Sequence, residues 1–181
     1  MLIILIVVIL LVIIIGMAVS TQRNLVQIDE FCGNAMSQIG VQQTSRWDAL
    51  TNLAKLTKDY SEFEYKSLMD IIASRKGIST RSTASDALEQ DNLMDQLTAK
   101  IFAIGEAYPD LKANSVYLST MDSLNDYENK VRISRMTYND TVTKFNRIVR
   151  QFPSCLFAGM FHFTVRDYLE ADANKTDMPK M

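Results

Sequence analysis

The residues that could carry out chemistry are few in this sequence, and their spacing matches no common catalytic or metal site. His162 is the only histidine, and Gly159 occupies the position three residues before it, so the Glu-x-x-His spacing of helical di-metal sites is absent. Catalysis by a Ser/His/Asp or Cys/His group would need His162 as its base, yet no nucleophile elbow is present. Phosphate-binding glycine loops and zinc spacings are also missing. We therefore expect a non-enzymatic protein without catalytic residues, metal or cofactor, in which His162 packs or lies on the surface.

Cysteine usage is equally sparse. Cys32 and Cys155 are single, far apart and not in a CxxC arrangement. A disulfide between them stays open at this point, but the pattern favours two buried free thiols, as in a reducing compartment.

Polar residues on otherwise apolar helical stripes form the main group of candidate site residues. Buried polar groups cost free energy unless they are paired, so we expect these side chains to find one another inside the protein. In the structural interpretation they fix the register of the helices, as a polar residue does in a coiled-coil seam. In the functional alternative they form a ligand or proton site. This predicted polar layer consists of Gln43, Arg46, Glu64, Asn114, Glu128, Arg135, Asn139 and Asn146.

Aromatic residues gather near the C-terminal end of the chain. Phe157, Phe161, Phe163 and Tyr168, which follow Phe152, are candidates for an interaction surface. Most of this cluster is expected to belong to the core. The three phenylalanines at 157, 161 and 163 cannot all share one helix face, so part of the cluster can face a neighbouring copy or the membrane surface.

These candidates follow an apolar stretch at Met1–Val19, MLIILIVVILLVIIIGMAV. A helix of this length measures roughly 28 Å, close to the roughly 30 Å of a bilayer's hydrocarbon core. A removable signal sequence would be shorter and would begin with basic residues, so the pattern favours an uncleaved single-pass span in contact with the lipid bilayer. Arg23 is the only basic residue near either end of the apolar stretch, which favours a cytoplasmic location for the rest of the chain.

The charged residues all follow this stretch. They comprise 19 lysines and arginines and 21 aspartates and glutamates, for a net charge of −2. This balance argues against nucleic acid as a partner and against a polybasic lipid-binding patch. The remaining length suits one domain, for which we expect a helical body over 20–172 and a mobile tail over 173–181.

Apolar residues recur at steps of three or four along most of this body, the period of α-helices, and no segment shows a strand pattern. The pattern predicts helices over 20–76, 83–107, 109–152 and 154–172. Nothing after Val19 would stop a helix, so we expect the membrane span to continue into the first of them as one rod. Four helices with short connections predict an all-α, antiparallel up-and-down four-helix bundle with long helices.

The stretch AYPDLKAN, from Ala107, and the residues that follow it as far as Pro153 resemble the LemA family of bacterial membrane-anchored helical proteins. The matching positions are Tyr108, Pro109, Asp110, Leu111, Lys112, Ala113, Asn114, Glu128, Arg135, Tyr138, Asn139, Asn146, Phe152 and Pro153, preceded by Asn24, Leu25, Val26, residues 34–41, Arg46, Asp48, Asn52 and Leu53.

The sequence departs from the family pattern at several positions, so the choice of partner is not carried over. Met36 stands where the family has tryptophan, Thr51 where it has proline, and residues 62–64 replace a His-Glu pair. The resemblance implies a membrane-anchored helical bundle without an established catalytic activity. One branch of the family is associated with magnetosome membranes and their remodelling.

Together these features predict a membrane protein that acts through other proteins. We expect a homo-oligomeric scaffold that organises or remodels the membrane, with other membrane proteins as further partners. The alternative is an accessory or sensor subunit that binds a partner or a small ligand through the bundle.

Overall fold

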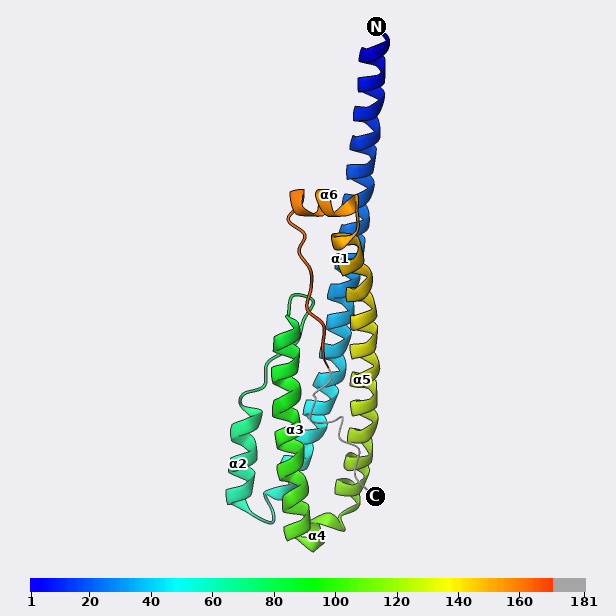
Figure 1. The fold of residues 1–181 in the computed structure, drawn as a ribbon. Coiled ribbons are helices and arrows are strands. Elements are labelled where there is room, and N and C mark those ends of the chain that lie inside the picture. The colour runs from blue at the N-terminus through cyan, green and yellow to red at the C-terminus, as the bar shows by residue number, and fades with distance from the viewer. Residues whose placement is uncertain (171–181) are drawn as a thin grey trace, which may run out of the picture.

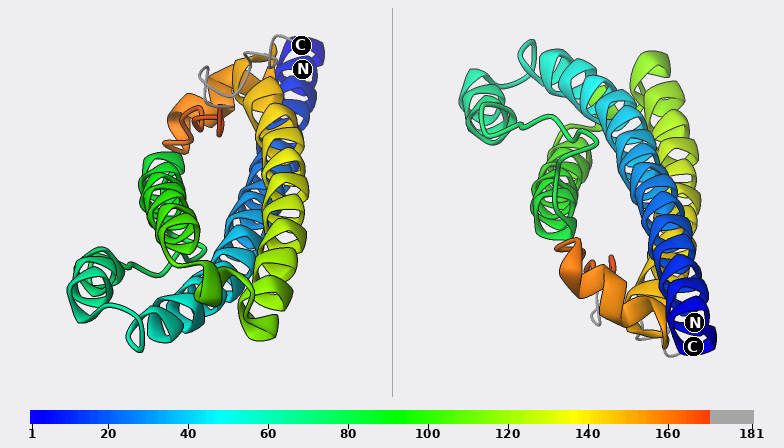
Figure 2. Two further views of the ribbon diagram at one scale, coloured as in Figure 1. Left: turned by 90° about the horizontal axis from the view of Figure 1, so that it is seen from below. Right: turned by 90° about the horizontal axis from the view of Figure 1, so that it is seen from above.

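The computed structural model describes residues 1–170, and these residues contain helices and no strand. Three long helices, α1 (Leu2–Thr57), α3 (Ala84–Ala107) and α5 (Ser115–Arg150), lie side by side (Figure 1). Seen from either end, α1 and α5 pack along each other while the shorter α2 (Glu62–Ile72) lies outermost (Figure 2). Two short helices, α4 (Pro109–Lys112) and α6 (Ser154–Met160), complete the fold.

The longest helix, α1, joins the apolar stretch to the folded body without a break, as the sequence predicts. Its first turns project from the rest of the protein, and the most apolar window has no buried residue. Among the described residues this is the one helix long and apolar enough to cross a membrane, judged by length and composition. The same helix buries Leu25 and then, from Cys32 to Thr57, at least one residue in every three or four positions, which is the pattern of a helix packed on one side.

The predicted continuous helix over 20–76 is wrong beyond Thr57. The chain turns there, with the backbone N–H of Ser61 donating to the carbonyl of Thr57 at 2.9 Å. Ser61 then caps α2 by accepting a hydrogen bond from the backbone N–H of Glu64 at 3.3 Å. Serine and threonine side chains compete for backbone groups in this way and favour helix ends. The apolar period continues across the turn because α2 folds back and still buries Leu68 in the core.

The connection from α2 to α3, residues 73–83, runs close over α1. Gly40 lies against the backbone carbonyl of Ile78, where an added Cβ would collide with it. Gln90 holds the same connection by accepting a hydrogen bond from the backbone N–H of Lys76 at 2.8 Å. The helix predicted for 83–107 is confirmed, and Thr83 and Asp86 form a capping box at its start.

The helix predicted for 109–152 is interrupted near its beginning. The single turn of α4 is followed by Asn114, whose side chain accepts hydrogen bonds from the backbone N–H groups of Val116 at 2.8 Å and Tyr117 at 3.4 Å. Asparagine in this position is a preferred N-cap, so it starts a new helix, α5.

The helix predicted for 154–172 is wrong after Met160. Beyond α6 the backbone turns at His162, where φ is 61°, and the described residues 163–170 have no regular secondary structure. Side chains of α5 bind the backbone groups of this segment and so replace the hydrogen bonds of a helix. The predicted tail, 173–181, lies outside the described residues.

Two apolar clusters form the core. The cluster nearer the apolar stretch includes Leu25, Cys32 and Phe145, whereas the far cluster includes Trp47 and Met94. On each of α1, α3 and α5 the residues of one cluster give way to those of the other around a short polar interval. The candidate site lies at this interval.

Candidate functional site

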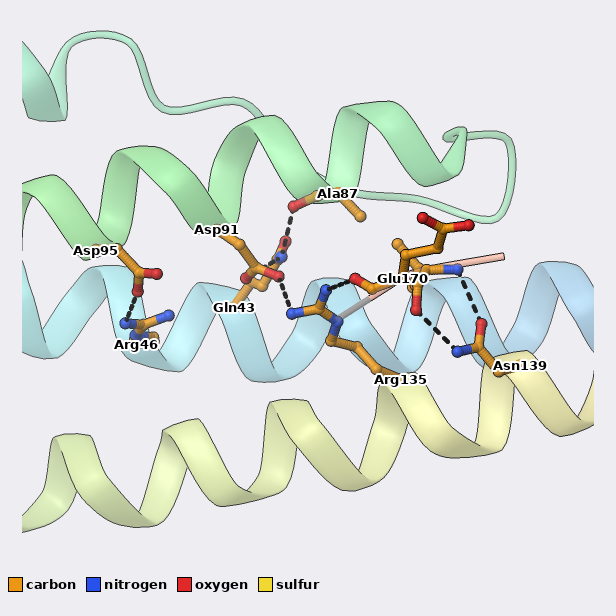
Figure 3. Close-up of polar contacts among 9 residues, drawn as sticks. Gln43, Arg46, Ala87, Asp91, Asp95, Arg135, Asn139 and Glu170 are labelled. Carbon is orange, nitrogen blue, oxygen red and sulfur yellow. Dashed lines mark hydrogen bonds and ion pairs between the residues drawn. The ribbon is translucent and has the colours of Figure 1, made fainter. Parts of the chain in front are cut away.

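A layer of charged and amide side chains from α1, α3 and α5 lies between the two core clusters, and Figure 3 shows it in close-up. Gln43 on α1 donates from Nε2 to Oδ1 of Asp91 on α3 at 2.8 Å and to the carbonyl of Ala87 at 3.1 Å. Arg135 on α5 approaches the other carboxylate oxygen of Asp91, with 3.1 Å between Nη1 and Oδ2. One turn along α1 and α3, Nη2 of Arg46 lies 2.7 Å from Oδ1 of Asp95.

Burial of Asp91 makes its charged form unfavourable in free energy. Only 6% of the residue is exposed, and this burial raises the pKa of its carboxyl above the ordinary value. The pKa is lowered by the charge of Arg135, by the hydrogen bond from Gln43 and by the charge of Arg46. The negative charge of Asp95 raises it further. A buried carboxylate without its cation would pay the full desolvation cost, so the arginines hold the layer together.

A cleft of about 670 Å³ opens beside this layer. Its walls carry charges of both signs. Asp91 and Glu128 are acidic, and Arg132 and Arg135 are basic. Met136 and Leu169 supply apolar surface in the same cleft. The volume is in the range of small-ligand sites, which are commonly concave and combine apolar walls with a few polar groups.

Two asparagines of α5 hold the C-terminal segment 163–170 by its backbone. Asn139 donates to the carbonyl of Leu169 at 2.8 Å and accepts from its N–H at 2.9 Å. Asn146 makes the same pair of bonds with Arg166, at 2.9 and 2.8 Å. Seven residues of helix rise by about 10.5 Å, and three residues of extended chain span about 10 Å, so the two spacings match. We call this arrangement the backbone clamp.

Further contacts fasten the same segment. The hydroxyl of Tyr138 donates to the carbonyl of Asp167 at 3.2 Å, and Nη2 of Arg135 donates to the carbonyl of Glu170 at 2.9 Å. Arg166 reaches across to Asp29 on α1, with Nε and Nη2 at 2.9 and 2.8 Å from Oδ1. Arg135 therefore joins the polar layer to the clamped segment.

The structure brings together five of the eight residues predicted for the polar layer, but in two places. Gln43, Arg46 and Arg135 pair with the aspartates of α3, while Asn139 and Asn146 form the clamp. Glu128 is exposed and lines the cleft.

Glu64 and Asn114 lie elsewhere, and each belongs to a helix start. Glu64 is in the first turn of α2, and Asn114 caps α5. Residues at a helix start stand next to the first apolar residues of that helix, so they can fall on an apolar stripe without belonging to the polar layer.

The aromatic candidates are divided between core and surface. Phe163 packs edge-on against Phe145, with 6.2 Å between the ring centroids, and Phe157 and Phe161 are half-buried. Tyr168 is exposed, and hydrogen bonds with Thr143 and Asn146 lower the pKa of its hydroxyl.

The aspartate partners were missing from the predicted layer. Asp91 stands on the apolar stripe of the helix predicted for 83–107, which is the signal that could have identified it, and Asp95 lies one turn later. The contact between Asp29 and Arg166 joins residues 137 positions apart, and no local pattern marks it.

The two cysteines are free thiols. Cys32 is buried, which raises the pKa of its thiol, and Cys155 is half-buried. Within residues 1–170 no group of three or more histidine, cysteine, aspartate or glutamate side chains is arranged to hold a metal ion.

Comparison with known families gives a match over most of the chain. The family model of LemA matches residues 35–181, which is most of the chain. The chain belongs to the LemA family. The LemA match contains the polar layer, the cleft and the backbone clamp, and it begins after the apolar stretch and after Asp29. A search of curated proteins finds no match to this LemA chain.

Proposed function

We propose that this LemA chain is a non-enzymatic, membrane-anchored scaffold that assembles with copies of itself and organises the membrane around it. The observation that supports the proposal best is the continuity of α1, whose exposed apolar turns and buried core positions belong to one helix. A helix shared by membrane and bundle would transmit the orientation of one to the other. Bundles packed side by side could then impose a shape on the bilayer.

The internal packing of the bundle supports the same proposal. Both core clusters and the polar layer include residues of α1, so the helix cannot rotate or slide without breaking all three. In this proposal the bundle lies in the cytoplasm, because Arg23 follows the apolar stretch closely and basic residues favour the cytoplasmic side of a span.

The experiment compares the mass of the full-length chain, in lipid nanodiscs and in mild detergent, with that of a chain starting at Thr21. The scaffold proposal predicts a discrete complex of several copies for the full-length chain and a smaller species without the apolar stretch. Circular dichroism of both proteins controls for loss of the helical fold. Monomers in both preparations would contradict the proposal.

A second candidate function rests on the charged cleft, which would make the protein an accessory or sensor subunit that binds a small ligand. A ligand of the cleft should raise the melting temperature of the native chain. Arg132 lines the cleft and is exposed, so Arg132→Ala should abolish this rise without unfolding the protein. Lys144→Ala, an exposed change elsewhere on α5, is the control and should leave the rise intact.

A further inference from the structure

The short helix α6 lies crosswise to the long helices at the end of the bundle from which the apolar part of α1 projects (Figure 1). Ala158 of α6 is fully buried in the apolar cluster that begins on α1 at Leu25, and α6 lies at the end of the body nearest the projecting part of α1 (Figure 1). Leu25 follows Val19, the last residue of the apolar stretch, by about 9 Å of helix. The lipid headgroup layer extends roughly 5–8 Å beyond the hydrocarbon on each side, and a helix has a radius of about 5 Å. The outer side of α6 is therefore level with the headgroup layer when the apolar stretch spans the bilayer.

That outer side is apolar. Phe152, Leu156 and Met160 are 76%, 65% and 59% exposed. Leu156 and Met160 are one helical turn apart and share a face, and Phe152 stands in the turn that leads into the helix. Ala158, two positions after Leu156, faces the opposite way into the core. Between Gln151 and Phe163 the chain has no aspartate, glutamate, lysine or arginine.

The charges that border this apolar face are suited to a membrane surface. Arg147 and Arg150 are exposed at the end of α5, a few residues before Phe152, and Arg23 is exposed on α1 just beyond the apolar stretch. Of the acidic residues at this end, Asp29 is paired with Arg166, and Glu30 is exposed. Basic side chains beside an apolar face attract lipid phosphates while the apolar groups enter the interface.

We propose that α6 and the turn before it rest on the bilayer surface, with Phe152, Leu156 and Met160 inserted among the lipid headgroups and upper acyl chains. This inference rests on the membrane anchoring in the proposed function, because the apolar stretch fixes the depth of α6. A helix that only spans a membrane can rotate about its axis and tilt. Contact of α6 with the bilayer on one side of α1 removes that freedom and fixes the orientation of the bundle relative to the membrane.

Quenching of tryptophan fluorescence by lipids brominated on their acyl chains tests this contact in the full-length protein. Trp47 is the only native tryptophan, is buried in the far core cluster, and lies about 42 Å of helix beyond Val19, so the native chain gives the baseline. Leu156→Trp and Met160→Trp place a reporter on the outer side of α6. Ile133→Trp, at an exposed position on α5, is the control outside the membrane, and Ile9→Trp is the control within it.

Leu156→Trp and Met160→Trp should lose much of their added fluorescence in brominated vesicles, with a smaller loss than Ile9→Trp and a far larger one than Ile133→Trp. Circular dichroism of each variant checks the fold, and the two α6 positions guard against one misfolded variant. If both match Ile133→Trp while Ile9→Trp is quenched, α6 does not touch the membrane although the anchor exists. In that case the apolar face of α6 would instead contact a second copy of the chain. If Ile9→Trp is not quenched, the anchor and the contact both fail.

Discussion

Replacing Asn146 by alanine should release the C-terminal segment from α5 without unfolding the bundle. Only 3% of Asn146 is exposed, and its side chain makes two hydrogen bonds to the backbone of Arg166. A typical intramolecular hydrogen bond contributes about 1 kcal/mol, so the change should cost about 2 kcal/mol. Every 1.4 kcal/mol is a factor of ten, and the segment should therefore open about thirty-fold more often.

The effect should be local, because residues 163–170 follow α6 and lie outside the three long helices, so the packing of α1 on α5 and α3 can persist without them. Hydrogen exchange followed by mass spectrometry measures this directly. The peptide covering 163–170 should exchange about thirty-fold faster in the variant, whereas peptides of α3 should keep their native rates. Asn92→Ala, an exposed asparagine on α3, is the matched control and should change neither region.

Two results would contradict a separate, locally held segment. Unchanged exchange at 163–170 would mean that the hydrogen bonds of Asn146 do not hold the segment. Equal acceleration in α3 would mean that the segment and the bundle open as one unit, so the clamp would be part of the global core.

Three further predictions concern the layer and the packing. Arg135→Ala should cost about 3 kcal/mol in urea unfolding because it strands the buried carboxylate of Asp91, and adding Asp91→Asn should recover part of that loss; no recovery would contradict the pairing. Because the folded-state pKa of Asp91 is raised, its contribution to stability is full below its ordinary pKa of 3.8 and is lost as the pH rises through the raised value. As the pH rises from 3.8 through the raised pKa, the native chain should therefore lose stability relative to Asp91→Asn. A difference in unfolding free energy between the two proteins that does not change with pH would contradict this. Gly40→Ala should lower the melting temperature because its Cβ meets the Ile78 carbonyl, whereas Gly159→Ala, which enters open space, should lower it less; equal shifts would argue against the contact.

The helical period was enough to predict where apolar faces lie, but not where the chain folds back. The stripe through Thr57 and Leu68 looks the same whether the helix continues or turns, because α2 presents its apolar residues to the same core. The local signal was Ser61, a capping residue inside an otherwise continuous pattern.

The arginines and the glutamine of the polar layer were predicted from the sequence, whereas its aspartates were not. Polar residues on apolar stripes pointed to Gln43, Arg46 and Arg135, and the cost of burial predicted that they would be paired. The clamp was harder to foresee because the partners of Asn139 and Asn146 are backbone groups. Backbone groups are identical in every residue, so the sequence carries no mark of which segment an asparagine will hold.

The proposed scaffold depends on the continuity of α1 from its exposed apolar turns into the bundle. It is tested most directly by inserting a short Gly-Ser spacer after Thr21 and measuring the mass of the protein in lipid nanodiscs. Such a spacer keeps the anchor and the bundle but removes the rigid connection between them. The native chain should form a discrete complex, and the spacer variant should give dispersed, membrane-bound monomers. The same complex in both proteins would show that assembly does not depend on the continuous helix.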